Sequence, residues 1–486
     1  EVHLAGGLPG MSVVGLPETA VKEARDRVKA ALINSGYRVP QRRVTISLAP
    51  AELPKVGGGF DLPIALGILA ASRQVPAERL ADCEFIGELA LGGELRPVRG
   101  VLPAALKARE AGRTLVLPMA NGPEAGLASG GTRHCARSLL QITAWLGGQR
   151  ELPAPPPPPD DDAAPDADLA EVLGQPRARR ALEITAGGGH NLLMVGPPGT
   201  GKTMLASRLP GILPPMSEEE ALEAAAVASI SHQGLDVRRW RRRPFRAPHH
   251  TCSGVALVGG GAYPRPGEVS LAHRGVLFLD ELTEFQRHVL DVLREPLESG
   301  RIVISRAARQ AEFPARFQLV CAMNPCPCGH HGDPRGDCHC SPDLVRRYRA
   351  RVSGPLLDRI DLQVEVNRPS VSLLHPDVER GEPSATVRER VLAARARQDA
   401  RSGCCNALLG PALIERHCHL GDELRALLDE ASERLNLSPR ACHRVLRVAR
   451  TVADLDRSEL IGRAHLAEAL SFRRPGTGDR ATGPRR

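Results

Sequence analysis

Long apolar runs are missing from this sequence of 486 residues, and no stretch approaches the roughly 18 apolar residues that a membrane helix requires. A signal-like segment with a charged start and an apolar centre is missing as well. Glu1 stands where a methionine would begin a natural chain, so we expect the natural N-terminus to lie upstream. We therefore expect a cytoplasmic protein that has no membrane partner.

Aromatic residues are also scarce, at 3%, while alanine, arginine and proline are abundant, as is typical of a GC-rich genome. The arginine content by itself therefore indicates little. The formal charge of +8 permits binding to nucleic acid without requiring it. With no secretion signal, the twelve cysteines predict reduced thiols, and any cluster of them favours a metal over disulfides. The length predicts two or three domains.

What the sequence does contain is a complete phosphate-binding loop, formed by Gly196, Pro197, Pro198, Gly199, Thr200, Gly201, Lys202 and Thr203. An apolar run precedes the loop and a helical pattern follows it, which a chance glycine-rich turn would not explain. The glycines allow backbone N–H groups to surround phosphates, Lys202 would reach the outer phosphates, and Thr203 would offer a hydroxyl to Mg²⁺. The motif predicts binding of ATP and Mg²⁺.

Two adjacent carboxylates, Asp280 and Glu281, end a second buried strand that begins at Gly275. In a parallel sheet we expect this strand to lie beside the one that feeds the phosphate loop. Asp280 would then lie near Mg²⁺, and Glu281 near a water that attacks the γ-phosphate. The alternative is a pair of acids that cap a helix.

Three further residues have the types and positions expected of ATP hydrolysis. Asn324 ends a third apolar strand, where its amide would orient the attacking water. Arg359, at an expected helix start, would reach the γ-phosphate of a neighbouring subunit, unless it forms an intrachain salt bridge with Asp358 or Asp361. Arg440, in the first turn of another helix, is a candidate nucleotide sensor in the same or a neighbouring subunit.

The regions on either side of this nucleotide-binding module have distinct patterns. Residues 1–150 predict a compact α+β domain, with helices at 17–34 and 62–71, a strand at 42–48 and two strands within 85–98. Residues 151–168, with five consecutive prolines and an Asp-rich stretch, predict an extended linker. Residues 376–472 predict a helical lid with helices at 385–398, 424–435, 441–453 and 463–472. Residues 473–486, rich in glycine, proline and arginine, predict a disordered basic tail.

A cysteine cluster lies shortly after Asn324 and consists of Cys326, Cys328, Cys338 and Cys340. Two close pairs of soft ligands suit tetrahedral Zn²⁺. The nearby histidines, His330, His331 and His339, are possible substitutes or partners. The alternative is four reduced cysteines in a loop rich in proline and glycine.

Two basic segments are candidates for DNA contact. Residues 301–312 predict a β-hairpin with Arg306 and Arg309 beside its tip, where the two guanidinium groups would track a phosphate backbone. A second candidate is the arginine run that contains Arg238, Arg239, Arg241 and Arg242 around Trp240. The alternative for both is a cationic loop that is only solvated.

The order of these motifs resembles the AAA+ clade of magnesium-chelatase and MCM-like motors, and more closely the YifB/ComM group. The segments 244–251, 266–274 and 324–329 carry the resemblance, which extends over nearly the whole chain. It implies an α/β fold with an AAA+ αβα parallel-sheet core over 169–375, a C-terminal helical lid over 376–472, and a hairpin at 301–312 that points into the central pore of a ring.

Segment 54–65 also resembles the part of Lon-protease-like (S5-like) domains that carries the nucleophile. Gly59 stands where those proteases have a serine, so the resemblance implies a Lon-like domain without a catalytic nucleophile. We then expect Lys55 to be a solvated surface lysine; the alternative is a lysine that binds an anionic group.

The resemblance as a whole implies a homohexameric, ATP-driven DNA helicase that promotes branch migration during natural transformation. Its partners would be single-stranded and branched DNA and possible recombinase-associated proteins. The main alternative is a metal-insertion motor like that of magnesium chelatase, acting on a protein partner, and a third is a nucleotide-switched scaffold. ATPase stimulation by forked or branched DNA would separate them.

Overall fold

The computed structural model describes residues 1–15, 19–51, 55, 57–159, 167–261, 264–306, 309–333, 336, 338–368 and 380–473. The contacts divide the chain into two compact units, Glu1–Ala163 with Ala228–Trp240, and Ala164–Val227 with Arg241–Arg486. The Asp-rich part of the predicted linker, at 160–166, lies outside the described residues, and so does the predicted basic tail, 473–486, apart from its first residue. That residue, Arg473, is 7% exposed, so the prediction of disorder is wrong for it. Within the described part of the chain, every helix is too short or too polar to span a bilayer.

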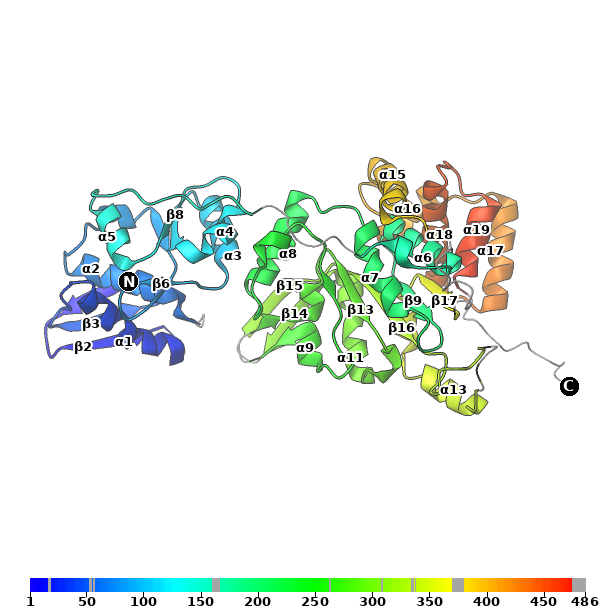
Figure 1. Ribbon diagram of the computed structural model, residues 1–486, viewed down its shortest axis with the longest axis horizontal. Helices are drawn as coiled ribbons and strands as arrows, with labels where there is room; N and C mark the ends of the chain where they lie inside the picture. Colours follow the sequence, from blue (N-terminus) through cyan, green and yellow to red (C-terminus); the bar gives the residue numbers. More distant parts are fainter. Residues whose placement is uncertain are drawn as a thin grey trace. The chain divides into compact units, whose positions relative to one another are not determined.

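The first unit packs helices against two small three-stranded sheets and a two-stranded ribbon (Figure 1). The sheets are β1 (Val2–Ala5), β3 (Arg43–Ser47) and β2 (Gly10–Val14), and β4 (Cys83–Phe85), β7 (Thr114–Pro118) and β8 (Arg133–Ala136). The ribbon is β5 (Glu88–Leu89) with β6 (Leu95–Arg96), and the helices are α1 (Thr19–Asn34), α2 (Asp61–Ala71), α3 (Val101–Glu110), α4 (Gly122–Gly126) and α5 (Leu139–Leu146). The five elements predicted in this region, which are two helices, one strand and the two strands within 85–98, are confirmed.

The protease-like segment of this unit has no hydroxyl at Gly59, which lies in the short 3₁₀ turn Gly58–Phe60. Lys55 is only 6% exposed, and its ammonium group donates a hydrogen bond to the carbonyl of Pro50. The expectation of a solvated surface lysine is therefore wrong, because the amine is buried and reaches the backbone carbonyl of Pro50. Asp61 is fully buried and bound by Arg27 through two contacts of 2.8 and 3.0 Å.

The second unit is built on a five-stranded parallel sheet (Figure 1). Its strand order is β10 (Phe245–Arg246), β13 (Val276–Leu279), β16 (Gln318–Met323), β9 (Leu192–Val195) and β17 (Leu362–Glu365). The α/β class and the parallel sheet are as predicted. We expected the Asp-Glu strand, β13, to lie directly beside the phosphate-loop strand, β9. This prediction is wrong, because β16 pairs with both strands and lies between them.

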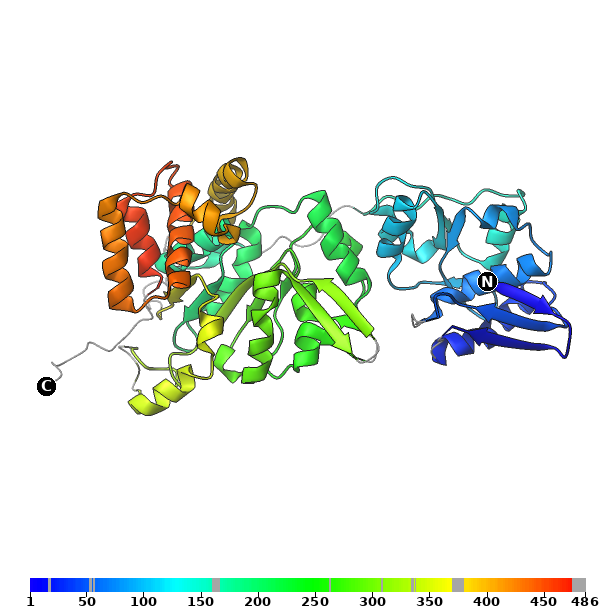
Figure 2. The same cartoon turned by 180° about the vertical axis from the view of Figure 1, so that it is seen from behind.

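Helices and two hairpins surround this sheet. The helices are α6 (Pro176–Gly188), α7 (Lys202–Ile212), α8 (Glu218–Ser229), α9 (Gly254–Val258), α10 (Glu268–Leu271), α11 (Arg287–Asp291), α12 (Pro296–Ser299), α13 (Pro342–Arg349) and α14 (Gly354–Leu357). The hairpins are β11 (Gly259–Gly260) with β12 (Arg265–Pro266), and β14 (Arg301–Arg306) with β15 (Arg309–Pro314). Figure 2 shows β14 and β15 as a pair of long arrows, so the predicted hairpin is confirmed.

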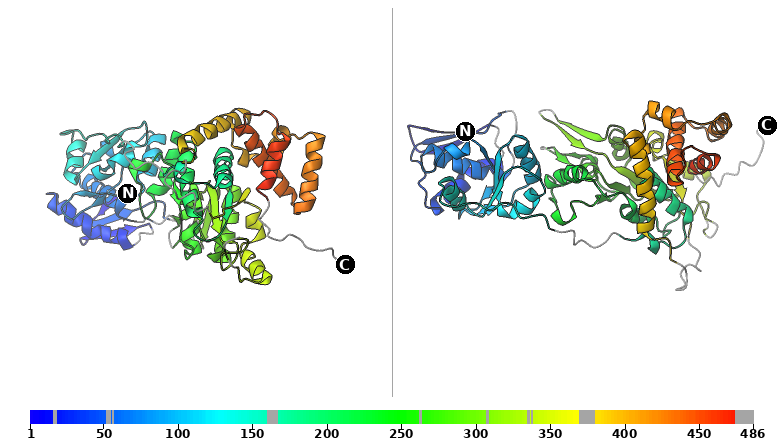
Figure 3. Two further views of the ribbon diagram at one scale, coloured as in Figure 1. Left: turned by 45° about the vertical axis from the view of Figure 1, so that its right-hand side comes forward. Right: turned by 90° about the horizontal axis from the view of Figure 1, so that it is seen from above.

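The C-terminal helices belong to the same compact unit as the sheet (Figure 3). They are α15 (Ser384–Ser402), α16 (Pro411–His417), α17 (Asp422–Leu435), α18 (Pro439–Leu455) and α19 (Arg463–Ser471), and the four helices predicted here are confirmed. α18 buries Val445, Val448 and Val452 in the cluster that also holds sheet residues. Buried His190, just before β9, meets Thr451 of α18 at 2.8 Å.

Candidate nucleotide-binding site

The phosphate loop joins the carboxyl end of β9 to the first residue of α7, which is Lys202. Gly199 and Gly201 have φ angles of 75° and 86°, in the left-handed region that glycine adopts without strain. A side chain at Gly196 would place its Cβ 2.1 Å from the carbonyl oxygen of Val366. The glycines are therefore required both by the turn and by the close approach of the chain after β17.

Lys202 is 8% exposed and lies folded onto the loop. Its Nζ donates to the carbonyl oxygens of Gly196 at 2.7 Å and Pro197 at 2.9 Å, and to Oδ1 of Asn324 at 3.2 Å. Burial lowers the pKa of Lys202 from its ordinary value, while Asp280 acts in the opposite direction. These contacts hold the ammonium group at the place where phosphate oxygens would replace the carbonyls.

The two predicted magnesium ligands lie together. Thr203 Oγ1 donates a hydrogen bond of 2.5 Å to Oδ2 of Asp280. The two residues meet although they follow β9 and β13, which are separated by β16 in the sheet. A hydroxyl and a carboxylate are hard oxygen donors, which suit Mg²⁺ carried by nucleotide phosphates. The donor set therefore fits the ion that the sequence motif predicts.

Glu281 directly follows Asp280 and takes a left-handed backbone conformation with φ 51° and ψ 47°. Its N–H donates to Oδ1 of Asp280 at 2.8 Å. Although Glu281 is positioned at the start of a 3₁₀ turn, its side chain makes no capping bond, so the helix-cap alternative does not hold for it. Its side chain is 54% exposed, and its Oε2 lies 2.9 Å from Nδ1 of His250.

His250 was missed as a site residue by the sequence reasoning. It stands in the loop after β10, and β10 pairs in parallel with β13, the strand that leads to Glu281. The signal that would have found it is the His249–His250 pair at the carboxyl end of a neighbouring strand. Both residues lie in segment 244–251, which carries the family resemblance, but the sequence analysis assigned neither of them a role.

Arg359 lies at the amino ends of the sheet strands, opposite the phosphate loop. Its backbone carbonyl accepts a hydrogen bond of 2.9 Å from Asn191, the residue just before β9. Its guanidinium group is nearly buried and contacts Oε1 of Glu298 at 2.5 Å and the carbonyl of Pro355 at 2.6 Å. Arg359 follows the end of α14 rather than a helix start. The alternative of an intrachain salt bridge is therefore found, but its partner is Glu298 and not Asp358 or Asp361. Arg444 binds Asp361 instead, at 2.7 Å.

Arg440 is exposed on α18 and lines a cavity of about 1110 Å³. The cavity also contains Asn191, Gly275 and Gln318, which stand at the amino ends of β9, β13 and β16. Arg440 is thus at the amino ends of these strands, whereas Lys202 is at their carboxyl ends. Seven arginines line this cavity, namely Arg243, Arg274, Arg316, Arg395, Arg440, Arg444 and Arg447.

The charges in this cavity are only partly balanced. Burial lowers the pKa of both Arg243 and Arg447. Although burial alone would raise the pKa of Asp361, its hydrogen bond with His190 and the charge of Arg444 hold that pKa well below its usual range. The lining also includes four acidic residues, namely Glu220, Glu298, Asp361 and Asp399.

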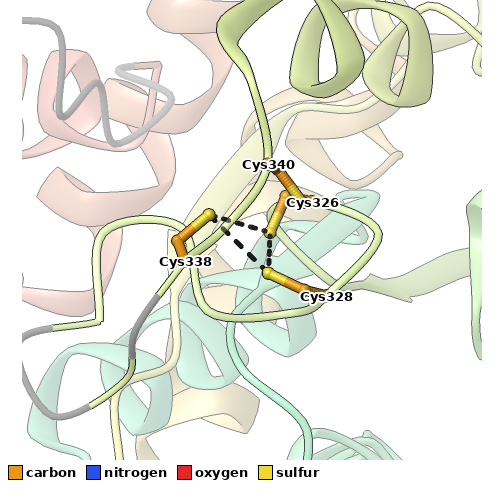
Figure 4. A group of neighbouring side chains, drawn as sticks. All are labelled: Cys326, Cys328, Cys338 and Cys340. Atoms are coloured by element: carbon orange, nitrogen blue, oxygen red, sulfur yellow. Dashed lines mark hydrogen bonds between the residues drawn. The ribbon is translucent and has the colours of Figure 1, made fainter.

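The four cysteines of the predicted cluster come together (Figure 4). Their sulfur atoms all lie within 4.8 Å of one another, with 3.3 Å between Cys326 and Cys328, 3.8 Å between Cys326 and Cys338, and 3.6 Å between Cys328 and Cys338. Zinc–sulfur bonds of about 2.3 Å place the sulfurs of a tetrahedron about 3.8 Å apart. The arrangement fits Zn²⁺.

The histidines near the cluster are not among the four converging ligands. The backbone N–H of His331 donates to Cys326 Sγ at 3.3 Å, and His330 Nδ1 lies 3.8 Å from Asp333. The cysteine loop also packs against the phosphate loop, because a Cβ at Gly329 would lie 2.6 Å from Cδ of Pro198.

The structure describes only some of the side chains of the candidate DNA-binding residues. Arg306 and Arg309 pair across the hairpin, and their side chains lie outside the described residues. Arg238 and Arg239 are exposed in the first unit, whereas Arg241 and Arg242 belong to the second. The last arginine of this run turns inward, since Arg243 binds the carbonyls of Pro214 and Arg274 at 2.6 Å each.

Three family profiles match the chain. The profile described as magnesium chelatase, subunit ChlI, matches residues 168–373, that described as subunit ChlI of Mg-chelatase matches residues 1–121, and that described as magnesium chelatase, subunit ChlI C-terminal, matches residues 381–473.

Two similar proteins match nearly the whole chain, and a third matches about two thirds of it. YifB of Escherichia coli strain K12 is 52% identical over 473 residues, which are 97% of this chain and 93% of that protein. Competence protein ComM of Haemophilus influenzae is 52% identical over 478 residues, 97% of this chain and 94% of that protein. The magnesium-chelatase 38 kDa subunit of Cereibacter sphaeroides is 27% identical over 327 residues, 62% of this chain and 89% of that protein.

Proposed function

The chain belongs to the YifB/ComM family of magnesium-chelatase-like AAA+ proteins, and from this premise we propose that it is an ATP-hydrolysing DNA motor. Its ring of identical subunits promotes branch migration of recombination intermediates during natural transformation. The relative named competence protein ComM supports the biological setting. The convergence of Lys202, Thr203, Asp280 and Asn324 at one edge of the sheet carries the ATPase part of the proposal.

Each of these residues has a defined task in hydrolysis. Lys202 exchanges its loop carbonyls for phosphate oxygens. Thr203 and Asp280 would hold Mg²⁺, which would supply positive charge against the charge that develops on the phosphates. Asn324, beside Lys202, orients the attacking water. Glu281 accepts a proton from that water once its carboxylate faces the γ-phosphate.

The positions of Arg359 and Arg440 support a ring. A strand rises about 3.3 Å per residue, so the two ends of β9 lie more than about 10 Å apart. The phosphate loop is at one end of β9, and the carbonyl of Arg359 and the arginine-lined cavity are at the other. In our proposal, both arginines therefore act on the nucleotide of the neighbouring subunit, and each ATP site is completed by the next chain.

The hairpin of β14 and β15 is the proposed DNA contact. Two arginines per subunit at its tip, Arg306 and Arg309, would track the phosphates of single-stranded or branched DNA. The exposed Arg238 and Arg239 are a second possible contact.

Twelve free cysteines and no disulfide bond in the described residues support a reducing cytoplasmic setting, where recombinase-associated proteins would be further partners.

Measuring ATPase activity with and without forked DNA tests this proposal. We expect forked DNA to stimulate the wild-type rate, and Arg306→Ala/Arg309→Ala to lose most of the stimulation while it keeps the basal rate. Arg301→Ala is the control, since it removes one arginine from the hairpin base, where Arg301 already pairs with Glu312 at 3.3 Å. A double variant that is stimulated like wild type would contradict the assignment of the hairpin.

A metal-insertion motor acting on a protein partner is the second candidate, and the match to the magnesium-chelatase 38 kDa subunit favours it. That match covers 62% of this chain, however, against 97% for ComM. A motor of this kind gains nothing from forked DNA, so the same ATPase measurement separates the two candidates.

We further propose that the four cysteines hold a structural Zn²⁺. Because Gly329 packs on Pro198, the metal would fix one wall of the phosphate loop and the segment that follows Asn324. We expect about one zinc per purified chain, measured by elemental analysis. Cys326→Ser/Cys338→Ser should lose the metal and lower the melting temperature, whereas Cys404→Ser, a thiol outside the cluster, should keep both. Less than about half a zinc per wild-type chain, with no effect of chelation, would contradict the site.

A further inference from the structure

Arg359, the proposed trans-acting arginine, is bound within its own chain by Glu298. Nη2 of Arg359 lies 2.5 Å from Oε1 of Glu298, and its Nη1 donates a hydrogen bond of 2.6 Å to the carbonyl of Pro355. The side chain of Arg359 is only 10% exposed. An arginine paired in this way must leave the carboxylate before it binds a phosphate held by another chain.

Of the two partners in this ion pair, Glu298 is the one that is free to move. Its side chain is 57% exposed and stands on the short helix α12. Arg359, in contrast, is fixed through its backbone, because its carbonyl accepts a hydrogen bond of 2.9 Å from Asn191 beside β9. A displacement of α12 would therefore break the ion pair and leave the backbone of Arg359 in place.

The helix α12 is joined directly to the base of the β14–β15 hairpin. Gly300 ends the helix, and β14 begins at the next residue, Arg301. Ser299 Oγ lies 2.9 Å from the carbonyl oxygen of Arg301. The carbonyl of Gly300 accepts a hydrogen bond of 2.8 Å from the N–H of Ala315, the residue after β15. Both strands of the hairpin are thus tied to the helix that carries Glu298.

The segment before α12 packs against the segment that leads to Arg359. α14 lies against the turn Val292–Arg294, in which Leu293 is fully buried. Ser353, the N-cap of α14, donates a hydrogen bond of 2.8 Å to Oδ1 of Asp291 at the end of α11. Because this turn is fixed, α12 is the part through which a movement of the hairpin reaches Arg359.

Glu298 also lines the arginine-lined cavity, as does Arg440, the other residue assigned to the neighbour's nucleotide. A triphosphate at this wall would bring negative charge toward Glu298. It would also compete for the guanidinium group of Arg359, since arginine binds carboxylates and phosphates with the same fork of N–H donors. The carboxylate of the same chain and the γ-phosphate of the neighbour are thus alternative partners of one guanidinium group.

We propose that Glu298 is a positioning residue that determines when Arg359 reaches the next subunit. DNA bound at the β14–β15 hairpin displaces α12, Glu298 leaves Arg359, and the guanidinium group turns to the γ-phosphate across the interface. DNA held by one subunit therefore stimulates hydrolysis at the ATP site of its neighbour and not at its own. This inference rests on the proposed DNA-dependent ring, and it names the subunit on which the DNA acts.

The first test compares Glu298→Ala with wild type in steady-state ATPase assays with and without forked DNA. We expect the DNA-independent kcat to rise by about threefold to fivefold, the range that loss of a partly exposed ion pair allows. The stimulation by DNA should fall. The KM for ATP should stay within about twofold, because Glu298 lies at the amino ends of the sheet strands, away from the phosphate loop.

Two further variants separate the charge of Glu298 from a general effect on the fold. Glu298→Gln keeps an acceptor without the charge, so its basal kcat should lie between those of wild type and Glu298→Ala. Glu295→Ala is the matched control, since it removes an exposed carboxylate from the residue before α12, where the side chain makes no capping bond. It should keep the kcat and the DNA stimulation of wild type.

Mixed rings test which subunit responds. Lys202→Ala chains keep the hairpin and Arg359 but have no working ATP site, whereas Arg306→Ala/Arg309→Ala chains keep the ATP site but lose the charge at the hairpin tip. In the mixture, some working sites are completed by Arg359 of a Lys202→Ala neighbour. DNA should therefore stimulate the mixture more than it stimulates the hairpin variant alone. Adding Glu298→Ala to the Lys202→Ala chain should remove this gain.

Each part of the proposal has its own contradicting result. A Glu298→Ala protein that melts like wild type but has an unchanged or lower basal kcat would overturn the restraint on Arg359. A mixture that DNA stimulates no more than the hairpin variant alone would overturn the action on the neighbour. A wild-type ATPase that ignores DNA would contradict the proposed function, whereas the basal kcat of Glu298→Ala judges the restraint separately.

Discussion

Replacement of Lys202 by alanine is expected to abolish ATP hydrolysis and every DNA-remodelling activity of this protein. Lys202 is the buried cation of the phosphate loop, and its ammonium group reaches Asn324 as well as two loop carbonyls. Without it, the triphosphate loses a charge-assisted contact that gains strength as charge develops in the transition state. We expect kcat/KM for ATP to fall by about 100-fold or more.

Lys107→Ala is the control for this change, since Lys107 is an exposed lysine of the first unit, with a side chain that is 79% accessible. It should hydrolyse ATP like wild type, and both variants should melt cooperatively. ATPase assays and titration with a fluorescent ATP analogue measure the effect. Strand displacement that survives in Lys202→Ala would show that the phosphate loop does not power the DNA activity.

Replacement of Arg359 by alanine is expected to lower kcat by about 1000-fold, as for other arginines that complete a phosphoryl-transfer site in trans. ATP binding should change little, because Arg359 lies at the edge of the sheet away from its own Lys202. Its guanidinium group contacts Glu298 at 2.5 Å. Assembly with a neighbour would therefore exchange that carboxylate for the γ-phosphate of the next subunit.

Co-expression of two inactive variants distinguishes action in trans from action in cis. A mixture of Arg359→Ala and Glu281→Gln subunits contains sites with an intact Glu281 from one chain and an intact Arg359 from its neighbour, so activity should return. A mixture of Glu281→Gln and Lys202→Ala should stay inactive, since both changes damage the phosphate-loop side of each site. No recovery in the first mixture would contradict the ring-shaped arrangement of sites.

Local patterns predicted much of this fold because they depend on nearby residues. The apolar face of α1 (Val21, Ala24, Val28, Ala31 and Leu32) is buried, and the hairpin at β14 and β15 pairs as its alternating sequence predicts. The four cysteines converge because close pairs in one loop have few other options. In each case the spacing alone limits the available geometry.

Features that depend on the order of strands in the sheet could not be predicted from the sequence. The placement of β16 between β13 and β9 is a long-range property, and so is the meeting of His250 with Glu281 across two strands. The ion pair between Arg359 and Glu298 joins residues that are 61 positions apart, so the acids next to Arg359 were the wrong candidates. Lys55 was misplaced because its partner, the carbonyl of Pro50, is a backbone group that residue types do not reveal.

Branch migration itself tests the central claim most directly. A labelled junction with one mobile branch is incubated with the protein, Mg²⁺ and ATP, and separation of the labelled strand is followed in time. We predict strand separation by the wild-type protein that depends on ATP, and none by Glu281→Gln, which binds ATP without hydrolysing it. A wild-type protein that hydrolyses ATP while the junction stays in place would contradict the claim that this ATPase is a DNA motor.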